Sequence, residues 1–130
     1  MPVIPESHAD ILRKRSFAHV ATADAAGVPQ VTPVWVDYDG EYVLINTAKG
    51  RKKDRNLRAN PHAAISVLDP DNPYRYLGLQ GEVVEMTEEG AFDHIHKLAQ
   101  KYWGRPYNAL GEGEVRVLYK IKPTRVWTKD

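Results

Sequence analysis

The chain of 130 residues contains no cysteine. Without cysteine there can be no disulfide, no thiolate nucleophile and few kinds of structural zinc site, and such a composition suits a reducing compartment. Long apolar runs are also missing, so we find neither a membrane-spanning helix nor the core of a signal peptide. We therefore expect a cytoplasmic protein with no membrane partner.

A strong excess of charge of either sign is missing as well. Lys and Arg total 18 against 17 Asp and Glu, which gives a net charge of +1. A nearly neutral chain has no general attraction for nucleic acid, so we expect no nucleic-acid partner. With 42% hydrophobic residues, the length suits one domain spanning residues 1–130.

Familiar catalytic motifs are absent too. The chain has no G-x-S-x-G elbow, no G-x-G-x-x-G turn and no G-x-x-x-x-G-K-[ST] loop, which removes the main support for a serine hydrolase, a Rossmann or a P-loop protein. His94 and His96 stand two apart in a helical pattern, so they point to different faces and predict helix packing or exposure rather than a metal site. We predict no metal ligand and name no catalytic acid or base.

Short strands separated by turn residues dominate the pattern. Alternating apolar residues predict strands at 17–23, 30–38, 42–47, 62–68, 75–86, 115–121 and 125–127. Helices are expected from a Ser7 cap to Arg13, between Gly50 and Asn60, and after a Thr87 cap. Asp39-Gly40 predicts a type I′ hairpin turn. Such an order predicts an α+β protein with a closed or nearly closed antiparallel barrel.

One segment concentrates positive charge. Residues 49–58 hold six basic residues and one acid, about +5, while the remaining chain sums to about −4. Cations at the start of a helix face the positive end of its dipole, which indicates a bound anion. Backbone N–H groups with Arg51, Lys52 and Lys53 would suit a phosphate. A solvated, charged helix face is the alternative.

Pro33 interrupts an otherwise regular strand and removes a ladder hydrogen bond, which predicts a sheet edge or a bulge. A free edge could bind a flat heterocycle, with Trp35 packed beside it. A plain edge strand with a core tryptophan stays open as the alternative. The hairpin should bring Asn46 and Thr47 beside this strand, close to the basic helix. Gly78 and Gly81 predict bulges or close approaches.

This order of features resembles the pyridoxamine 5′-phosphate oxidase-like family, whose members are split β-barrels that bind flavins or the deazaflavin coenzyme F420. The resemblance rests on residues 27–35, 44–47, 50–61 and 81–83. The pattern Arg-x-Lys-x-Arg-Asn-Leu-Arg-x-Asn-Pro over residues 51–61 is most similar to the small branch of F420-dependent reductases. The chain lacks the basic C-terminal segment of the pyridoxine-phosphate oxidases proper, so vitamin B6 oxidation is not expected.

The resemblance implies an antiparallel, six- to seven-stranded Greek-key split β-barrel with a few peripheral helices. It also implies a homodimer with the cofactor in a groove between protomers. Carried over by position, the phosphate would be held by Arg51, Lys52 and Lys53, with Asn46 and Thr47 next to them. The ring system would run along Gln30, Val31, Thr32, Pro33, Val34 and Trp35, and the second subunit would contribute Tyr74 and Tyr76.

The function that the resemblance implies is hydride transfer between reduced coenzyme F420 and a small electron-poor acceptor such as a quinone or an enone. Three alternatives stay open. An FMN-dependent oxidoreductase would need the same phosphate grip, and a non-catalytic protein could carry or store the cofactor. A nucleic-acid-binding barrel has only the basic cluster in its favour.

Overall fold

The computed structural model describes residues 3–130, which form three helices and seven strands. The elements in chain order are α1 (Glu6–Arg13), β1 (Phe17–Ala23), β2 (Pro29–Trp35), β3 (Asp37–Tyr38), β4 (Val43–Ala48), α2 (Lys52–Ala59), β5 (His62–Asp69), β6 (Asn72–Thr87), α3 (Ala91–Trp103) and β7 (Arg116–Lys129). No helix within this range is long and apolar enough to cross a membrane.

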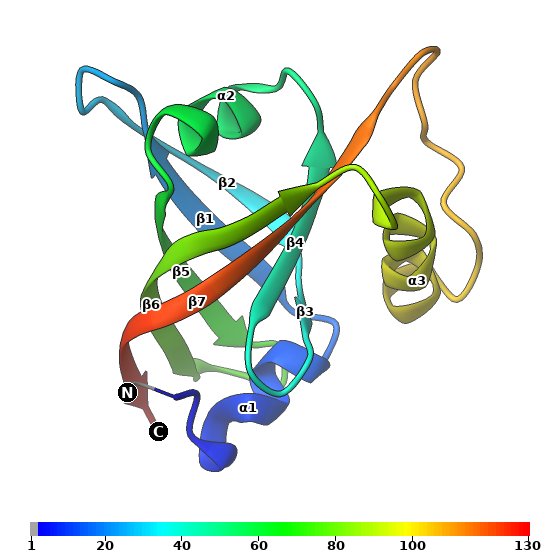
Figure 1. The fold of residues 1–130 in the computed structure, drawn as a ribbon. Helices are drawn as coiled ribbons and strands as arrows, with labels where there is room; N and C mark the ends of the chain where they lie inside the picture. The colour runs from blue at the N-terminus through cyan, green and yellow to red at the C-terminus, as the bar shows by residue number, and fades with distance from the viewer. Residues whose placement is uncertain (1–2) are drawn as a thin grey trace.

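The strands form one antiparallel sheet in the order β2-β1-β5-β6-β7-β4-β3. Its two edge strands, β2 and β3, are consecutive in the chain and are separated only by Val36. The chain therefore joins the two edges of the curled sheet, while β2 and β4 diverge without pairing (Figure 1). The prediction of an antiparallel six- to seven-stranded split barrel of the α+β class is confirmed.

The strand predicted over 30–38 is thus divided, and α3 explains how the division is tolerated. A break in a ladder leaves backbone groups that need other partners. The Tyr102 hydroxyl accepts a hydrogen bond from Val36 N at 3.1 Å, and Lys101 Nζ donates to Val36 O at 2.7 Å. Tyr102 also donates to the carbonyl of Ser16. Side chains of α3 therefore replace the sheet partners that Val36 lacks.

Alternation along the strands fills the barrel. On β7, Val117, Tyr119 and Ile121 are fully buried, and on β4 the same holds for Val43 and Ile45. The intervening side chains of β4 and β7 point outward, and α3 with the segment after it covers this outer face (Figure 1). The core therefore lies inside the curled sheet, with α3 outside it beside β4 and β7.

A bulge at Gly81 and a close approach at Gly78 account for these two glycines of β6. The pairing register shifts between Gln80 and Gly81, where β7 contributes Thr124 as an extra residue, so the two strands predicted on either side of 122–124 are one continuous strand. A Cβ on Gly78 would lie 2.1 Å from Nε1 of Trp127. The prediction of a bulge or close approach at both glycines is confirmed.

Three local predictions are wrong. Ser7 does not cap α1: the cap position is Pro5, and Ser7 Oγ instead bonds His8 Nδ1. Thr87 does not cap α3 either, because its hydroxyl accepts from Glu89 N in a turn and the helix begins after Gly90. In the hairpin at Asp39, only Gly40 has positive φ, and the Asp39 carboxylate holds a four-residue loop by accepting from Glu41 N and Tyr42 N.

Candidate functional site

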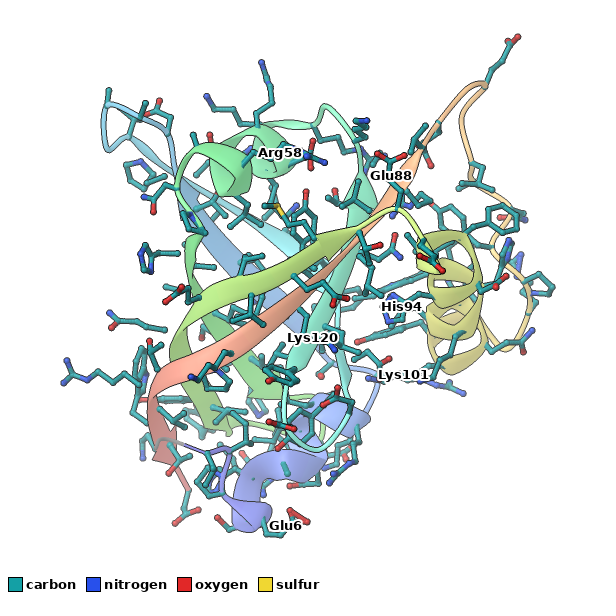
Figure 2. All side chains as sticks on the ribbon, viewed as in Figure 1. Glu6, Arg58, Glu88, His94, Lys101 and Lys120 are labelled. Atoms are coloured by element: carbon teal, nitrogen blue, oxygen red, sulfur yellow. The ribbon has the colours of Figure 1, made fainter. Side chains whose placement is uncertain are left out.

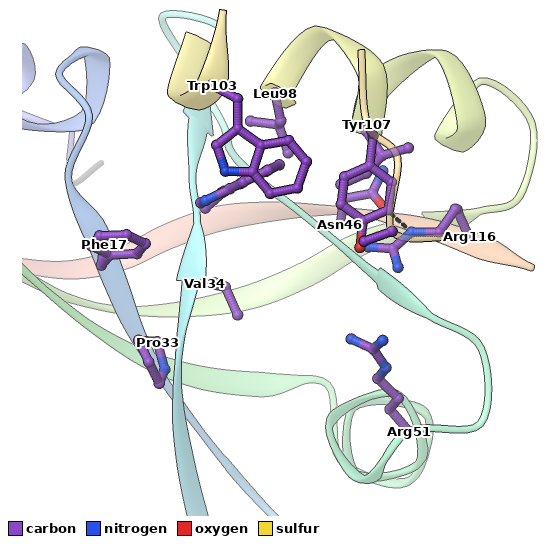
Figure 3. A pocket seen from close by; sticks show the side chains of 12 residues that line it. Phe17, Pro33, Val34, Asn46, Arg51, Leu98, Trp103, Tyr107 and Arg116 are labelled. Atoms are coloured by element: carbon purple, nitrogen blue, oxygen red, sulfur yellow. Dashed lines mark hydrogen bonds between the residues drawn. The ribbon is translucent and has the colours of Figure 1, made fainter. Parts of the chain in front are cut away.

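The split between β2 and β4 contains a cavity of about 280 Å³. Strand residues form one side, and α3 with the segment following it forms the other (Figure 3). Its lining consists of Phe17, Pro33, Val34, Trp35, Asn46, Arg51, Ile95, Leu98, Trp103, Tyr107, Ala109 and Arg116. A mostly apolar hollow with a few polar groups at one end is the usual form of a small-molecule site.

Aromatic rings build the apolar wall. Trp35 stacks on Tyr102 with ring centroids 5.1 Å apart and meets the edge of Trp103 at 4.7 Å. Trp103 in turn stacks on Tyr107 at 5.5 Å, and Tyr107 N donates to His96 Nδ1 at 3.0 Å. These contacts fix the segment after α3 against the cavity. The wall offers flat, rigid surfaces to a planar ligand.

Cationic side chains gather at the other end of the cavity. Arg51, from the residue before α2, and Arg116, from the start of β7, extend toward the same space (Figure 3). Glu114 lies between them, 3.5 Å from Arg51 Nη2 and 3.1 Å from Arg116 Nη1. Lys53 is the third cation: burial, together with Arg51 and Arg116, lowers the pKa of its ammonium.

Two buried hydroxyls on β2 and β4, the strands that flank the split, lack partners. Within residues 3–130, Thr32 Oγ1 on β2 and Thr47 Oγ1 on β4 are buried and make no hydrogen bond. Buried polar atoms are normally satisfied, so unpartnered ones indicate a missing ligand or water. Arg51 and Arg116, with Lys53 close to both, form a set of cationic donors that fits the phosphate of a flavin-type cofactor. We observe no cluster of three or more metal-ligating side chains in the described range.

Asp54 positions the basic segment for this role. Its carboxylate accepts from Gly50 N at 2.8 Å, from Arg58 Nε at 3.0 Å and from the buried Tyr119 hydroxyl. Burial raises the pKa of Asp54, but these hydrogen bonds outweigh burial and the pKa falls below its usual value. An ionised Asp54 therefore locks the start of α2 to the barrel core, with Arg51 on the cavity side.

Other cations of the segment turn to acidic partners. Lys49 Nζ lies 2.9 Å from Glu88, and Lys52 Nζ lies 3.9 Å from Asp24 in the β1–β2 turn. Both pairs are partly exposed to solvent, so each is worth little. Arg51 and Lys53 thus remain the members of the segment nearest to Arg116.

The structure brings together part of the predicted site. Pro33, Val34, Trp35, Asn46 and Arg51 line the cavity. The edge position predicted for the Pro33 strand is confirmed, because within residues 3–130 β2 pairs with β1 alone. The other predicted residues are not among the lining residues of this cavity: Gln30, Val31, Thr32, Thr47, Lys52, Lys53, Tyr74 and Tyr76.

The predicted residues that do not line the cavity differ in how deeply they are buried. Thr32, Thr47 and Lys53 are the partly or fully buried groups described above, while Tyr74 is 79% exposed near the β5–β6 turn. A role for Tyr74 and Tyr76 depends on a second protomer, as the resemblance implies, and stays a prediction.

Sequence reasoning missed several lining or neighbouring residues: Phe17, Trp103, Tyr107, Glu114 and Arg116. Arg116 occupies an outward position in a normally alternating strand, so its pattern carries no signal of function. It reaches Asn46 only because β7 pairs with β4, bringing together residues 70 apart in the chain. For Trp103 and Tyr107 a signal was available: these two aromatic residues lie beside and within a segment rich in glycine and proline, a combination from which part of a binding site could have been predicted.

Comparison with known proteins places this geometry in a family. The family model described as pyridoxamine 5′-phosphate oxidase matches residues 4–130. Among curated proteins, none matches the chain.

Solved structures agree with the family match. An F420 reductase is 35% identical with a TM-score of 0.86, over 95% of this chain and 98% of that one. A conserved hypothetical protein, Rv2991 from Mycobacterium tuberculosis, is 25% identical with a TM-score of 0.75, over 98% and 86% of the two chains. HutZ, a heme storage protein from Vibrio cholerae, shares the fold at 18% identity and a TM-score of 0.69, over 99% and 96%.

The family match spans nearly the whole chain, and the cavity lies where the two edges of the curled sheet diverge. The chain belongs to the pyridoxamine 5′-phosphate oxidase family.

Proposed function

We propose that this protein is an F420-dependent oxidoreductase that transfers hydride between reduced coenzyme F420 and a small electron-poor organic acceptor such as a quinone or an enone. One observation carries the proposal. Arg51 and Arg116 line one end of an aromatic-walled cavity, with Lys53 close to both, in a chain 35% identical to an F420 reductase.

Each group has a separate task in this proposal. Arg51, Lys53 and Arg116 neutralise the phosphate, and Thr32 and Thr47 donate hydrogen bonds that are now unmade. The wall of Trp35, Trp103 and Tyr107 excludes water and orients the planar ring system.

The deazaflavin supplies the hydride chemistry when bound. In the part of the chain that the structure describes, the lining residues include neither an imidazole nor a carboxylate, so we assign no side chain as a catalytic acid or base. The chain's own contribution is binding, orientation and a dry wall.

FMN is a second candidate, and the ion pairs of the basic segment favour it. Coenzyme F420 carries an acidic tail beyond its phosphate, for which Lys49, Lys52, Arg55 and Arg58 are the available surface cations. Asp54 binds Arg58, and Glu88 binds Lys49, so part of this positive charge is already neutralised. Because the exposed Lys49 pair can exchange partners with little loss, the tailed coenzyme stays the first candidate.

The expected assembly is a homodimer that places the cavity beside a partner. Across the outer face of the sheet, paired residues form the row Pro33, His19, Ser66, Gly78 and Trp127. Around it, Val31 is 60% exposed, and Phe17 and Leu68 are also exposed. A broad face of small and apolar side chains is typical of a subunit interface.

Oxidation of reduced coenzyme F420 by menadione, a simple quinone, tests the activity. We expect turnover by the purified protein and a drop of about 100-fold in kcat/KM for the double variant Arg51→Ala with Lys53→Ala. His62→Gln, at an exposed position on β5, is the control and should keep wild-type activity. Turnover that is equal in all three proteins would show that the cationic cluster does not serve the coenzyme.

A further inference from the structure

A chain of hydrogen bonds runs beneath α3 from Asp37 to the cavity. His94 is 8% exposed and points from α3 toward the strands (Figure 2). Its Nε2 lies 3.1 Å from Asp37 Oδ2, and its Nδ1 lies 3.1 Å from Asn46 Nδ2. Asn46 Oδ1 accepts from Arg116 Nε at 2.8 Å. The helix-packing position expected for His94 therefore connects directly to the cationic cluster.

Two obligatory partners fix the orientation of the Asn46 amide. Arg116 Nε can only donate, so it must face Oδ1, and the carbonyl of Ala91 can only accept, so it must face Nδ2 at 2.8 Å. The second hydrogen of Nδ2 then points to His94 Nδ1, which must be unprotonated. His94 is thus the neutral tautomer with its proton on Nε2, where it donates to Asp37.

Protonation of Nδ1 has no compatible arrangement. It would set an N–H of His94 against an N–H of Asn46, and a flipped amide would oppose Arg116 Nε and the Ala91 carbonyl at once. The imidazolium would remain attractive to Asp37. Asn46 and His94 must therefore separate, and where Asn46 moves, Arg116 loses this hydrogen bond and keeps only its ion pair with Glu114.

Charged groups from β3, from α3 and from the side of β7 lie around His94. From β3 comes Asp37, which also contacts Lys97 at 3.3 Å; the hydrogen bond from His94 holds the pKa of Asp37 well below its usual range. Two turns further along α3, Lys101 binds the carbonyl of Val36. From the side of β7 come Arg116, paired with Glu114, and Lys120, which lies over the ring of Tyr42.

We infer that His94 is a positioning residue that holds Arg116 through Asn46, so that protonation of His94 weakens anion binding in the cavity. The identity of the anion as the phosphate of coenzyme F420 rests on the proposed function. The coupling itself rests on the hydrogen bonds between Asp37, His94, Asn46 and Arg116.

Binding of coenzyme F420 at pH 8 and pH 5.5, measured by fluorescence, gives the first test. We expect wild-type affinity to fall about tenfold as His94 is protonated, because Arg116 loses its hydrogen bond to Asn46. The amide side chain in His94→Gln can accept a hydrogen bond from Asn46 and donate one to Asp37, and it does not titrate. The loss of affinity that follows protonation of His94 in the wild type should therefore be absent from this variant. The control His62→Gln should follow the wild type. Any titration of the coenzyme affects all three proteins equally, so equal pH dependence in wild type and His94→Gln would overturn the inference.

A second test does not depend on the coenzyme. Nitrogen NMR of the wild type should show His94 protonated on Nε2 alone at pH 8, and sulfate, which does not titrate in this range, should shift the Arg116 Nε–H signal. As His94 gains its second proton, the Arg116 signal should change and its response to sulfate should weaken. If coenzyme F420 fails to bind while this coupling appears, the proposed function is wrong and the inference stands. A protonated Nδ1 with an unchanged Arg116 signal and sulfate response would overturn it, even if His94→Gln does not fold.

Discussion

At the scale of single residues, the charge of Lys53 should favour binding of a phosphate and lower the stability of the folded protein. Burial and the neighbouring Arg51 and Arg116 disfavour its charge in the folded protein, as its lowered pKa shows. Lys53→Met keeps the aliphatic stem and removes the charge, so the free energy of unfolding should rise, by on the order of 1 kcal/mol in urea denaturation. Decreased stability would mean that the ammonium makes a structural contact.

The double variant Arg51→Ala with Lys53→Ala should weaken binding of coenzyme F420 by about 2 to 4 kcal/mol in calorimetry, because hydrogen bonds to charged groups are strong and the two losses do not fully add. Lys52→Ala is the matched control, since Lys52 lies toward Asp24 outside the cavity lining, and it should cost much less. Unchanged affinity in the double variant together with lost stability would make the cluster structural.

Glu114 places a carboxylate between the two arginines that an incoming phosphate must reach. Glu114→Gln keeps the size of the side chain and removes its competing negative charge. We expect affinity for coenzyme F420 to rise several-fold, since repulsion between anions in a partly buried site is removed. A weaker affinity in the same titration would show that Glu114 is needed to hold Arg51 and Arg116 in place.

At the scale of elements, Asp37 ties β3 to α3 through His94 and Lys97. The hydrogen bond from His94 lowers the pKa of Asp37, so the unfolded chain binds its proton first as the pH falls. This contribution is complete above about pH 5 and is lost progressively below it. Wild type should therefore lose more unfolding free energy than Asp37→Asn between pH 5 and pH 2. Parallel curves in urea denaturation would contradict this link.

Local patterns were sufficient to predict most elements and insufficient at their boundaries. Alternation located the strands because one face of each packs into the core, and Gly78 and Gly81 signalled a bulge and a close approach. The break at Val36 was not predictable, since its backbone groups bind Lys101 and Tyr102, more than 60 residues away. The caps expected at Ser7 and Thr87 failed because nearby groups offered their hydroxyls other partners.

Local patterns likewise predicted some residues of the candidate site and not others. Residues within contiguous motifs, such as Pro33 to Trp35 and Arg51, were predicted to lie near the cofactor and do line the cavity. Arg116, Glu114 and His94 join the site only through the pairing of β4 with β7 and the packing of α3. Cross-strand neighbours of this kind leave no trace in local spacing.

At the scale of the whole molecule, the outer face of the sheet predicts self-association. Light scattering at micromolar concentration should give the mass of a homodimer. Leu68→Glu puts a charge on this face at a position 41% exposed in the protomer, so it should shift the mass toward a monomer without unfolding the barrel. A wild-type monomer would contradict the proposed shared groove, and an unaffected Leu68→Glu dimer would place the interface elsewhere.

Binding of coenzyme F420 in the cavity is tested most directly by comparing the affinity of the protein for coenzyme F420 with its affinity for FMN at low and high salt. Contacts between the acidic tail and exposed cations such as Lys52 and Arg55 are weak and screened. Coenzyme F420 should bind more tightly than FMN at low salt and lose more affinity as salt rises. Arg55→Ala with Arg58→Ala should reduce that difference. Tighter binding of FMN at low salt, or equal salt dependence for the two ligands, would contradict the assignment.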